Sequence, residues 1–545
     1  MSGGPSDIVV RHIHQVALWP LQLMPLRPDV QVQRHWEAFD AMPVPHQWRE
    51  LRDRFGGDSG EFQESHYREF VTFLPYVQRF LYGASAGQES SRHREPSMRV
   101  FRRTDVALAR LSFVDGEVVD FRIAHVDLYF FLDADIAILA FGMHTNDLPL
   151  PRAQDALFRF GRAYPGSWDD TGCGGNCLQR VEWLDHSGKV LARSDYENRA
   201  KFLEHVAQHR SPCIASHWEF LLRPLELEEP GCKALLRYRL LEYYRMPMMA
   251  YVAVDEPTAL SRGDFVRLCL FTQPDDRDAL PYSGRSLEKF EEQYCDDRFW
   301  GRAGSNSSGD TRLMCTANSL TVVGRHGDSF FRGADSGMLG MFRHQYFLLF
   351  LIAHFHKAAL LSMSDELAVA MNRLDITDTE SVRRFKRSIR QAMEIFLRFT
   401  HRYWFHEVTN QPLARSLFQR LTQQLGTDAL YEEVRCEVAD MNNYLDTDSV
   451  RRQANTIVRL TVVTIFGLIG TVATGFLGMN LLAHADRPLA WRVIFFITVL
   501  GVTSALTVFT IVKSRRLADF LDALSDERVS WGAKWQSLVR AFWRT

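Results

Sequence analysis

Apolar positions between residues 98 and 145 follow a pattern typical of β-strands, with many β-branched and aromatic side chains. The dipeptide Asp115-Gly116 interrupts them with a turn signal, which favours a hairpin or meander. Similar runs follow at 177–196, 248–255, 265–271 and 320–327, with helical candidates at 198–208 and 212–223. We therefore expect an α/β or α+β domain that occupies residues 1–330.

The run YFLLFLIAHFHKAALL, residues 346–361, is strongly apolar but short for a membrane span. His354, His356 and Lys357 lie inside it, which favours a buried helix over a span. Two histidines at positions i and i+2 point in different directions on a helix. We do not expect this pair alone to form a metal site.

Long helices are predicted for residues 335–455, as a stalk. Thr377 with Glu380 indicates a capping box at the start of one helix. Another should begin near Thr427, directly after Gly426, and no proline interrupts it before residue 480. Those 54 residues would make a rod of roughly 80 Å. Apolar residues recur along its first part at intervals of three and four, namely Leu430, Val434, Val438, Met441 and Leu445.

Two segments near the C-terminus are free of charge for 24 residues after Arg459 and for 20 residues after Arg492. Each is long enough to cross a membrane, so we expect spans at 456–480 and 491–513 joined by an external loop at 481–490. Basic residues lie before the first span and after the second, including those of the tail at 514–545. The positive-inside rule then places both termini in the cytoplasm, with the spans in the inner (plasma) membrane. A pair of buried helices and a simple tail anchor are the alternatives.

One stripe of the first predicted span repeats with a mean step of 3.5 residues, which is typical of a helix–helix seam. Two helices cannot enclose an ion path, so this stripe would line a pore only if several copies assembled around an axis. A packing face that uses Gly467, Gly470, Gly475 and Gly478 is the alternative. Counted back from Asn480, the stripe contains Gly475, Thr471, Leu468, Thr464, Leu460, Ile457 and Ala454.

The overall charge gives no argument for a nucleic-acid partner, because 64 basic residues nearly balance 66 acidic ones. The eight cysteines are scattered, as expected for reduced thiols in a cytoplasmic domain. Cys173 and Cys177 in CGGNC lack a second matching pair, so a glycine-rich turn is favoured over a zinc or redox site. The apolar N-terminus is broken by Pro20, Gln22 and Pro25, and we expect no signal peptide.

Gly478-Met479-Asn480, at the end of the first of two C-terminal spans and after a long helix, resembles the motif of the CorA superfamily of divalent-cation channels. The resemblance implies a homopentameric funnel with a pore lined by the first span and a mouth formed by a ring of Asn480. Magnesium would meet that ring as a hydrated ion, because Mg²⁺ gives up its water reluctantly. Thr471 and Gly475 fall where the family's pore has a threonine and a glycine. The resemblance also places Ile457, Leu460 and Leu468 at apolar constrictions.

The loop LLAHADRPLA departs from magnesium-carrying relatives because it has no glutamate. His484 leaves zinc or another transition metal open as cargo, as in the ZntB branch. Asp133 and Asp135 are weak candidates for a regulatory cation site. A membrane-anchored oligomeric sensor or scaffold is a further alternative.

We expect no enzyme activity and no resident cofactor, because neither a P-loop pattern nor a nucleophile–base–acid arrangement is found. The C-terminal tail carries an amphipathic pattern that favours either contact with membrane lipid or packing on the stalk.

Overall fold

The computed structural model divides into two compact units, Met1–Val438 and Ala439–Thr545. Its first unit is an α/β fold built on one mixed sheet. The structure describes residues 8–26, 34–42, 47–51, 64–83, 97–132, 134–229, 232, 234–241, 245–274, 282–301, 310–375, 378–483, 488–491, 493–495, 497–499, 501–503, 505 and 509.

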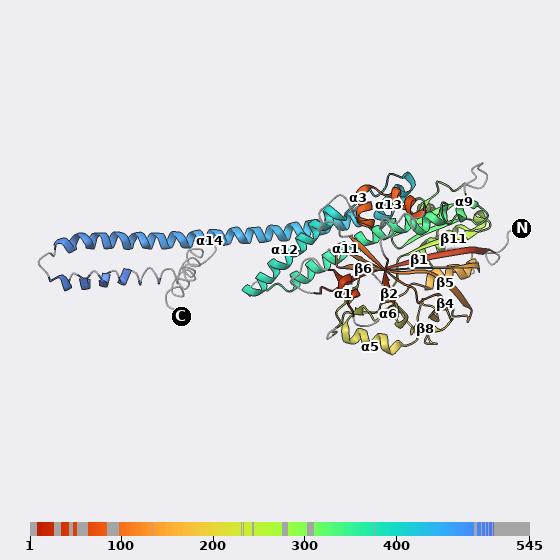
Figure 1. The fold of residues 1–545 in the computed structure, drawn as a ribbon, viewed down its shortest axis with the longest axis horizontal. Helices are drawn as coiled ribbons and strands as arrows, with labels where there is room; N and C mark the ends of the chain where they lie inside the picture. The colour runs from red at the N-terminus through yellow and green to blue at the C-terminus, as the bar shows by residue number, and fades with distance from the viewer. Residues whose placement is uncertain are drawn as a thin grey trace. The chain divides into compact units, whose positions relative to one another are not determined.

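The sheet has the strand order β12-β13-β14-β11-β1-β6-β5-β4-β7-β8. Off this path, β10 pairs with β1 and with β9, and β3 pairs with β5 and with β2. Its long central strands lie side by side in Figure 1. The strands are β1 (Val9–Leu23), β2 (Trp48–Glu50), β3 (Met98–Arg103), β4 (Leu108–Ser112), β5 (Val118–Phe131), β6 (Ile136–Pro149), β7 (Arg180–Leu184), β8 (Val190–Arg193), β9 (Glu226–Leu227), β10 (Arg237–Leu240), β11 (Met248–Val254), β12 (Cys295–Asp296), β13 (Arg312–Cys315) and β14 (Ser319–Arg325).

Helices alternate with the strands along the chain, and further helices come after the last strand. They are α1 (His35–Asp40), α2 (Glu64–Thr72), α3 (Pro75–Tyr82), α4 (Leu150–Arg159), α5 (Arg199–His209), α6 (Ser216–Leu222), η2 (Pro257–Ala259), α7 (Arg262–Leu270), α8 (Gly284–Tyr294), α9 (Ser329–Arg332), α10 (Met338–Met341), η3 (Phe342–Tyr346), α11 (Phe347–Asn372), α12 (Thr379–Arg402), α13 (Pro412–Leu425) and α14 (Thr427–Ala483).

The central strand β1 contains a proline, which cannot donate a hydrogen bond to a neighbouring strand. Pro20 lies opposite Ile138 of β6 on one side. On its other side, β11 pairs with β1 up to Ala17 and β10 pairs from Leu21 onward. The proline therefore falls in the gap between two partner strands. The sequence pattern gave no strand prediction here, because Pro20 interrupts the apolar run.

Most predicted strands are confirmed. Residues 98–145 form β3 to β6, with Gly116 in the left-handed region at φ 87° in the predicted turn. The prediction of a strand at 265–271 is wrong, because this run belongs to α7. Ser261 and Asp264 form a capping box that starts the helix, and an apolar run cannot by itself distinguish a buried strand from a buried helix.

The apolar run at 346–361 is a buried helix, as predicted. Met338–Asn372 is the described helical stretch that is long and apolar enough to cross a membrane, with a mean hydropathy of 1.5, but 83% of its most apolar part is buried inside the protein. α11 packs on β1 and β6 of the sheet (Figure 1). Phe355 stacks on Phe131 with ring centroids 4.1 Å apart. The length and composition of this stretch are therefore those of a core helix.

Two helix starts follow local signals. The N-cap of α12 is Asp378, whose carboxylate accepts hydrogen bonds from the backbone of Glu380 and Ser381. Thr377, the predicted capping residue, lies outside the described residues. Gly426 ends α13 with φ 66°, and α14 begins at Thr427 as predicted. With 57 residues, α14 is a rod of roughly 85 Å.

Candidate functional site

The motif Gly478-Met479-Asn480 belongs to the last turns of α14, which remains helical to Ala483. The side chains of Met479 and Asn480 lie outside the described residues, as does His484 of the loop. The ring of Asn480 and the alternative of a transition-metal cargo, suggested by His484, therefore stay predictions. The backbone places the motif at the end of a helix whose preceding turns are described.

The positions predicted to line a pore share the exposed face of α14 in the single chain. Ile457, Leu460 and Leu468 expose 64%, 68% and 65% of their surface, which is unusual for large apolar side chains in water. Within the second unit, the opposite face of the helix is covered, with Val462 only 8% exposed. The remaining members of the stripe with described burial are also exposed, namely Ala454, Thr464, Thr471 and Gly475.

The covered face includes Gly470, which lies close to Thr503 of the second apolar helical stretch, Leu489–Thr503. A Cβ atom added at Gly470 would lie 2.6 Å from the Cγ2 atom of Thr503, so only a glycine permits this approach. By contrast, a Cβ atom at Gly467, Gly475 or Gly478 would meet no atom of the described residues within 4 Å. Among these four glycines, Gly470 is the one that the described residues show packed against a second helix.

The threonines of the stripe present oxygen atoms without adding charge. The hydroxyl of Thr464 donates to the carbonyl of Leu460 at 2.7 Å, and that of Thr471 donates to Gly467 at 2.9 Å. Because the hydroxyl protons are used inside the helix, the outward-facing oxygens are acceptors. Such oxygens can accept hydrogen bonds from the water shell of a cation.

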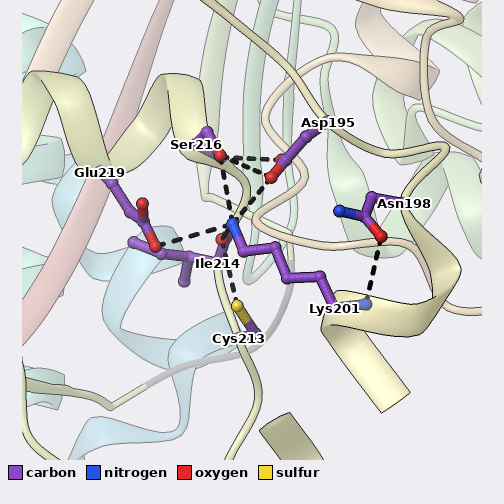
Figure 2. Close-up of polar contacts among 7 residues, drawn as sticks. All are labelled: Asp195, Asn198, Lys201, Cys213, Ile214, Ser216 and Glu219. Carbon is purple, nitrogen blue, oxygen red and sulfur yellow. Dashed lines mark hydrogen bonds and ion pairs between the residues drawn. The ribbon is translucent and has the colours of Figure 1, made fainter. Parts of the chain in front are cut away.

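A second cluster lies in the first unit, around Lys201 of α5 (Figure 2). The Lys201 ammonium donates to the Asp195 carboxylate at 2.7 Å and to the Ser216 hydroxyl at 3.1 Å. Glu219 of α6 lies farther away, with 3.9 Å between its Oε1 atom and Lys201 Nζ. Asp195 also accepts from the backbone N–H of Ser216, so one carboxylate joins the starts of α5 and α6.

Burial and pairing set the charge states in this cluster. Burial alone would raise the pKa of Asp195, but hydrogen bonds from Lys201 and Ser216 outweigh it and lower that pKa. For Glu219, burial dominates and the pKa is raised despite the attraction of Lys201. Burial also raises the pKa of Cys213 to about 11, which keeps this thiol protonated and unreactive. The cluster is therefore a structural ion pair rather than a nucleophile.

Asp135, one of the two weak regulatory candidates, follows β5 with φ 43°. Its carboxylate lies 2.7 Å from His35 Nε2. Burial, together with the charges of Asp135 and Asp365, raises the pKa of Glu366 to about 7. The other candidate, Asp133, lies outside the described residues. The structure thus pairs Asp135 with His35, and the negative charge of Asp135 helps to raise the pKa of Glu366.

Four histidines gather on the central strands, and sequence reasoning missed them. His14 and His144 stack with ring centroids 5.7 Å apart, and His12 lies 5.8 Å from His144. Burial lowers the pKa of each of these histidines and that of His125 on β5. The spacing of His12 and His14 could have indicated part of this group, because alternate residues share one face of a strand.

Two other sequence candidates are core residues. Burial lowers the pKa of His354 to about 3 and that of His356 to about 4, and His356 Nε2 contacts the carbonyl oxygen of Tyr403 at 2.6 Å. The two rings have different neighbours, as expected for positions i and i+2.

Cys177 is buried, and burial raises its pKa to about 12, whereas Cys173 is partly exposed. All eight cysteines are free thiols.

Comparison with known proteins found no matching family model and no matching curated protein.

Proposed function

We propose that five copies of this chain form a channel of the CorA type that moves a divalent cation, with magnesium as the first candidate, across the cell's inner membrane. Residues 456–480 and 491–513 are the two spans, and both termini lie in the cytoplasm. The observation that carries the proposal is the uncharged stripe of α14, which faces away from the neighbouring helix and leads to Gly478-Met479-Asn480.

The stripe has the composition that a pore for hydrated ions requires. Leu460 and Leu468 are apolar enough to close a narrow passage by excluding water. Thr464 and Thr471 offer acceptor oxygens between and beyond them. No member carries a formal charge, so a divalent ion would pass without being trapped.

Assembly supplies what one chain lacks. Two helices cannot surround an ion, and a closed ring of copies turns one exposed stripe into an inner wall. Burial of Ile457, Leu460 and Leu468 between copies would also remove large apolar side chains from their exposed positions. At the mouth, five neutral carboxamides of Asn480 would accept hydrogen bonds from the ion's water shell.

The first experiment determines the number of subunits of the full chain in detergent by mass measurement of the intact particle. Five copies support the proposal. A monomer refutes it, because the stripe would then have no wall to form.

The second experiment measures Mg²⁺ and Zn²⁺ uptake into liposomes that contain the protein. Asn480→Ala should change flux or selectivity without loss of assembly, whereas Asn443→Ala, an exposed carboxamide on the same helix, should not. Unchanged flux and selectivity in Asn480→Ala would favour the non-conducting sensor or scaffold. Faster uptake of Zn²⁺ than of Mg²⁺ would assign the cargo to the transition metals.

A matched pair of threonines tests the lining face. Thr471→Val removes a hydroxyl from the exposed stripe, and Thr474→Val removes one from the half-buried side, where it donates to Gly470 at 2.9 Å. We expect lower flux from Thr471→Val alone. Equal effects of the two substitutions would count against the assigned face.

A further inference from the structure

Two histidines and a carboxylate come together at the end of α5. His205 and His209 are four residues apart in the segment HVAQH, which places both on one face of the helix. Their ring centroids lie 4.6 Å apart. Glu229, which follows β9, brings its Oε1 atom to 3.5 Å from Nδ1 of His205. One ligand atom from each of the three residues lies within 4.8 Å of the other two.

The donor atoms are suited to a metal ion. Two imidazole rings and a carboxylate are ligand types that Zn²⁺ binds in proteins. With Nδ1 of His205 facing Glu229, the other ring nitrogen lies 3.5 Å from the Ser211 hydroxyl, a contact that can fix the tautomer. Nδ1 of His209 is buried and has no hydrogen-bond partner among the residues that the structure describes. A buried nitrogen in this state lacks the interaction that most such atoms have.

The charges around the three residues also favour a cation. The cluster lies at the C-terminal end of α5, where the helix dipole is negative. Lys201, one turn before His205, is paired with Asp195 (Figure 2). Its positive charge is therefore offset by a neighbouring carboxylate.

We propose that His205, His209 and Glu229 bind a transition-metal ion of the zinc class, with water in the fourth position. In a tetrahedral site with bonds of about 2.0–2.1 Å, donor atoms are about 3.3 Å apart. The contact between His205 and Glu229 is already close to that separation, and the wider pairs need to close by about 1.5 Å or less. Mg²⁺ prefers oxygen ligands and does not compete for two imidazoles.

Such a site would connect α5 to the segment after β9. It belongs entirely to the first unit and is separate from the predicted pore, so it stands whether or not the chain conducts ions. Neither histidine forms part of a recognised catalytic motif, because HVAQH lacks the glutamate of the HExxH pattern. The inference is therefore restricted to metal binding.

The test uses the full chain in detergent, stripped with a chelator and titrated with Zn²⁺ or Co²⁺. We expect His209→Ala to lose one bound Zn²⁺ per chain, with affinity at that site lower by more than about 100-fold, because even a hydrogen-bonded partner of a ligand contributes 10- to 100-fold. Visible Co²⁺ absorption typical of tetrahedral coordination should disappear in the same variant. His401→Ala, an exposed histidine on α12, is the matched control and should bind like the wild type.

Two further variants keep the result independent of folding. Glu229→Gln and His205→Gln preserve size and polarity, and circular dichroism checks that each variant is folded. The same loss of one Zn²⁺ in folded variants supports the site. Equal Zn²⁺ stoichiometry in the wild type and in all three variants overturns it. Because Asn480→Ala leaves this site intact, its zinc binding should be unchanged even if its ion flux is altered.

Discussion

Glu366 of α11 provides a pH-dependent test of the first unit. Its pKa is raised from the ordinary 4.5 to about 7, first by burial and then by the charges of Asp135 and Asp365. The folded chain thus holds a proton that the unfolded chain releases near pH 4.5. Stability from this group is fully present below that pH and is lost as the pH rises to about 7.

The magnitude follows from the difference between the two pKa values. At 1.36 kcal/mol per pKa unit, the rise corresponds to roughly 3 kcal/mol in the free energy of unfolding. Glu366 keeps part of its surface exposed to solvent. Contact with water screens the charge and reduces the expected effect to about 2 kcal/mol. Glu366→Gln removes the titration and keeps the shape of the side chain. The free energy of unfolding of Glu366→Gln, relative to that of the wild type, should therefore increase by about 2 kcal/mol between pH 5 and pH 8.

Urea unfolding of the full chain, followed by tryptophan fluorescence at several pH values, measures this difference. The buried Trp19 and Trp36 report on the first unit. Glu292→Gln, an exposed glutamate on α8, is the matched control and should show a pH-independent difference from the wild type. A constant difference between Glu366→Gln and the wild type from pH 5 to pH 8 would refute the reasoning.

Three further substitutions and one control substitution test packing and pairing. Gly470→Val should lower the melting temperature in detergent, because its Cβ meets the stiff side chain of Thr503, whereas Gly467→Val has open space and should not. Lys201→Met should cost about 2 kcal/mol by urea unfolding, because Asp195 would keep a partly buried charge without its cation. Phe355→Ala should cost about 4 kcal/mol in the same assay by leaving a cavity against the sheet, and a loss below 1 kcal/mol would contradict the buried position of α11.

Local signals in the sequence were sufficient for several elements. Gly426 and the proline-free run after it predicted the start of α14, and Asp115-Gly116 predicted the turn before β5. His354 and Lys357 inside an apolar run predicted a buried helix, and α11 is one. These predictions depend on backbone conformation or on the cost of burying charge, which neighbouring residues in the chain determine.

Contacts between distant segments were beyond the sequence pattern. Pro20 is tolerated in a central strand only because β11 and β10 leave a gap beside it. His205 and Glu229 are 24 positions apart, and no periodicity relates them. The capping box at Ser261 was readable, but the apolar run after it fits a strand equally well when burial is unknown.

The sequence by itself determined the long helix α14, the charge-free runs near the C-terminus and the stripe that ends in Gly478-Met479-Asn480. These features depend on local spacing along one helix, which a linear pattern can represent. Only the tertiary structure decided that β1 is central, that the pKa of Glu366 is raised, and that two histidines meet a carboxylate beside α5. Those outcomes depend on which surfaces exclude water from which side chains, and burial is a property of the folded chain as a whole.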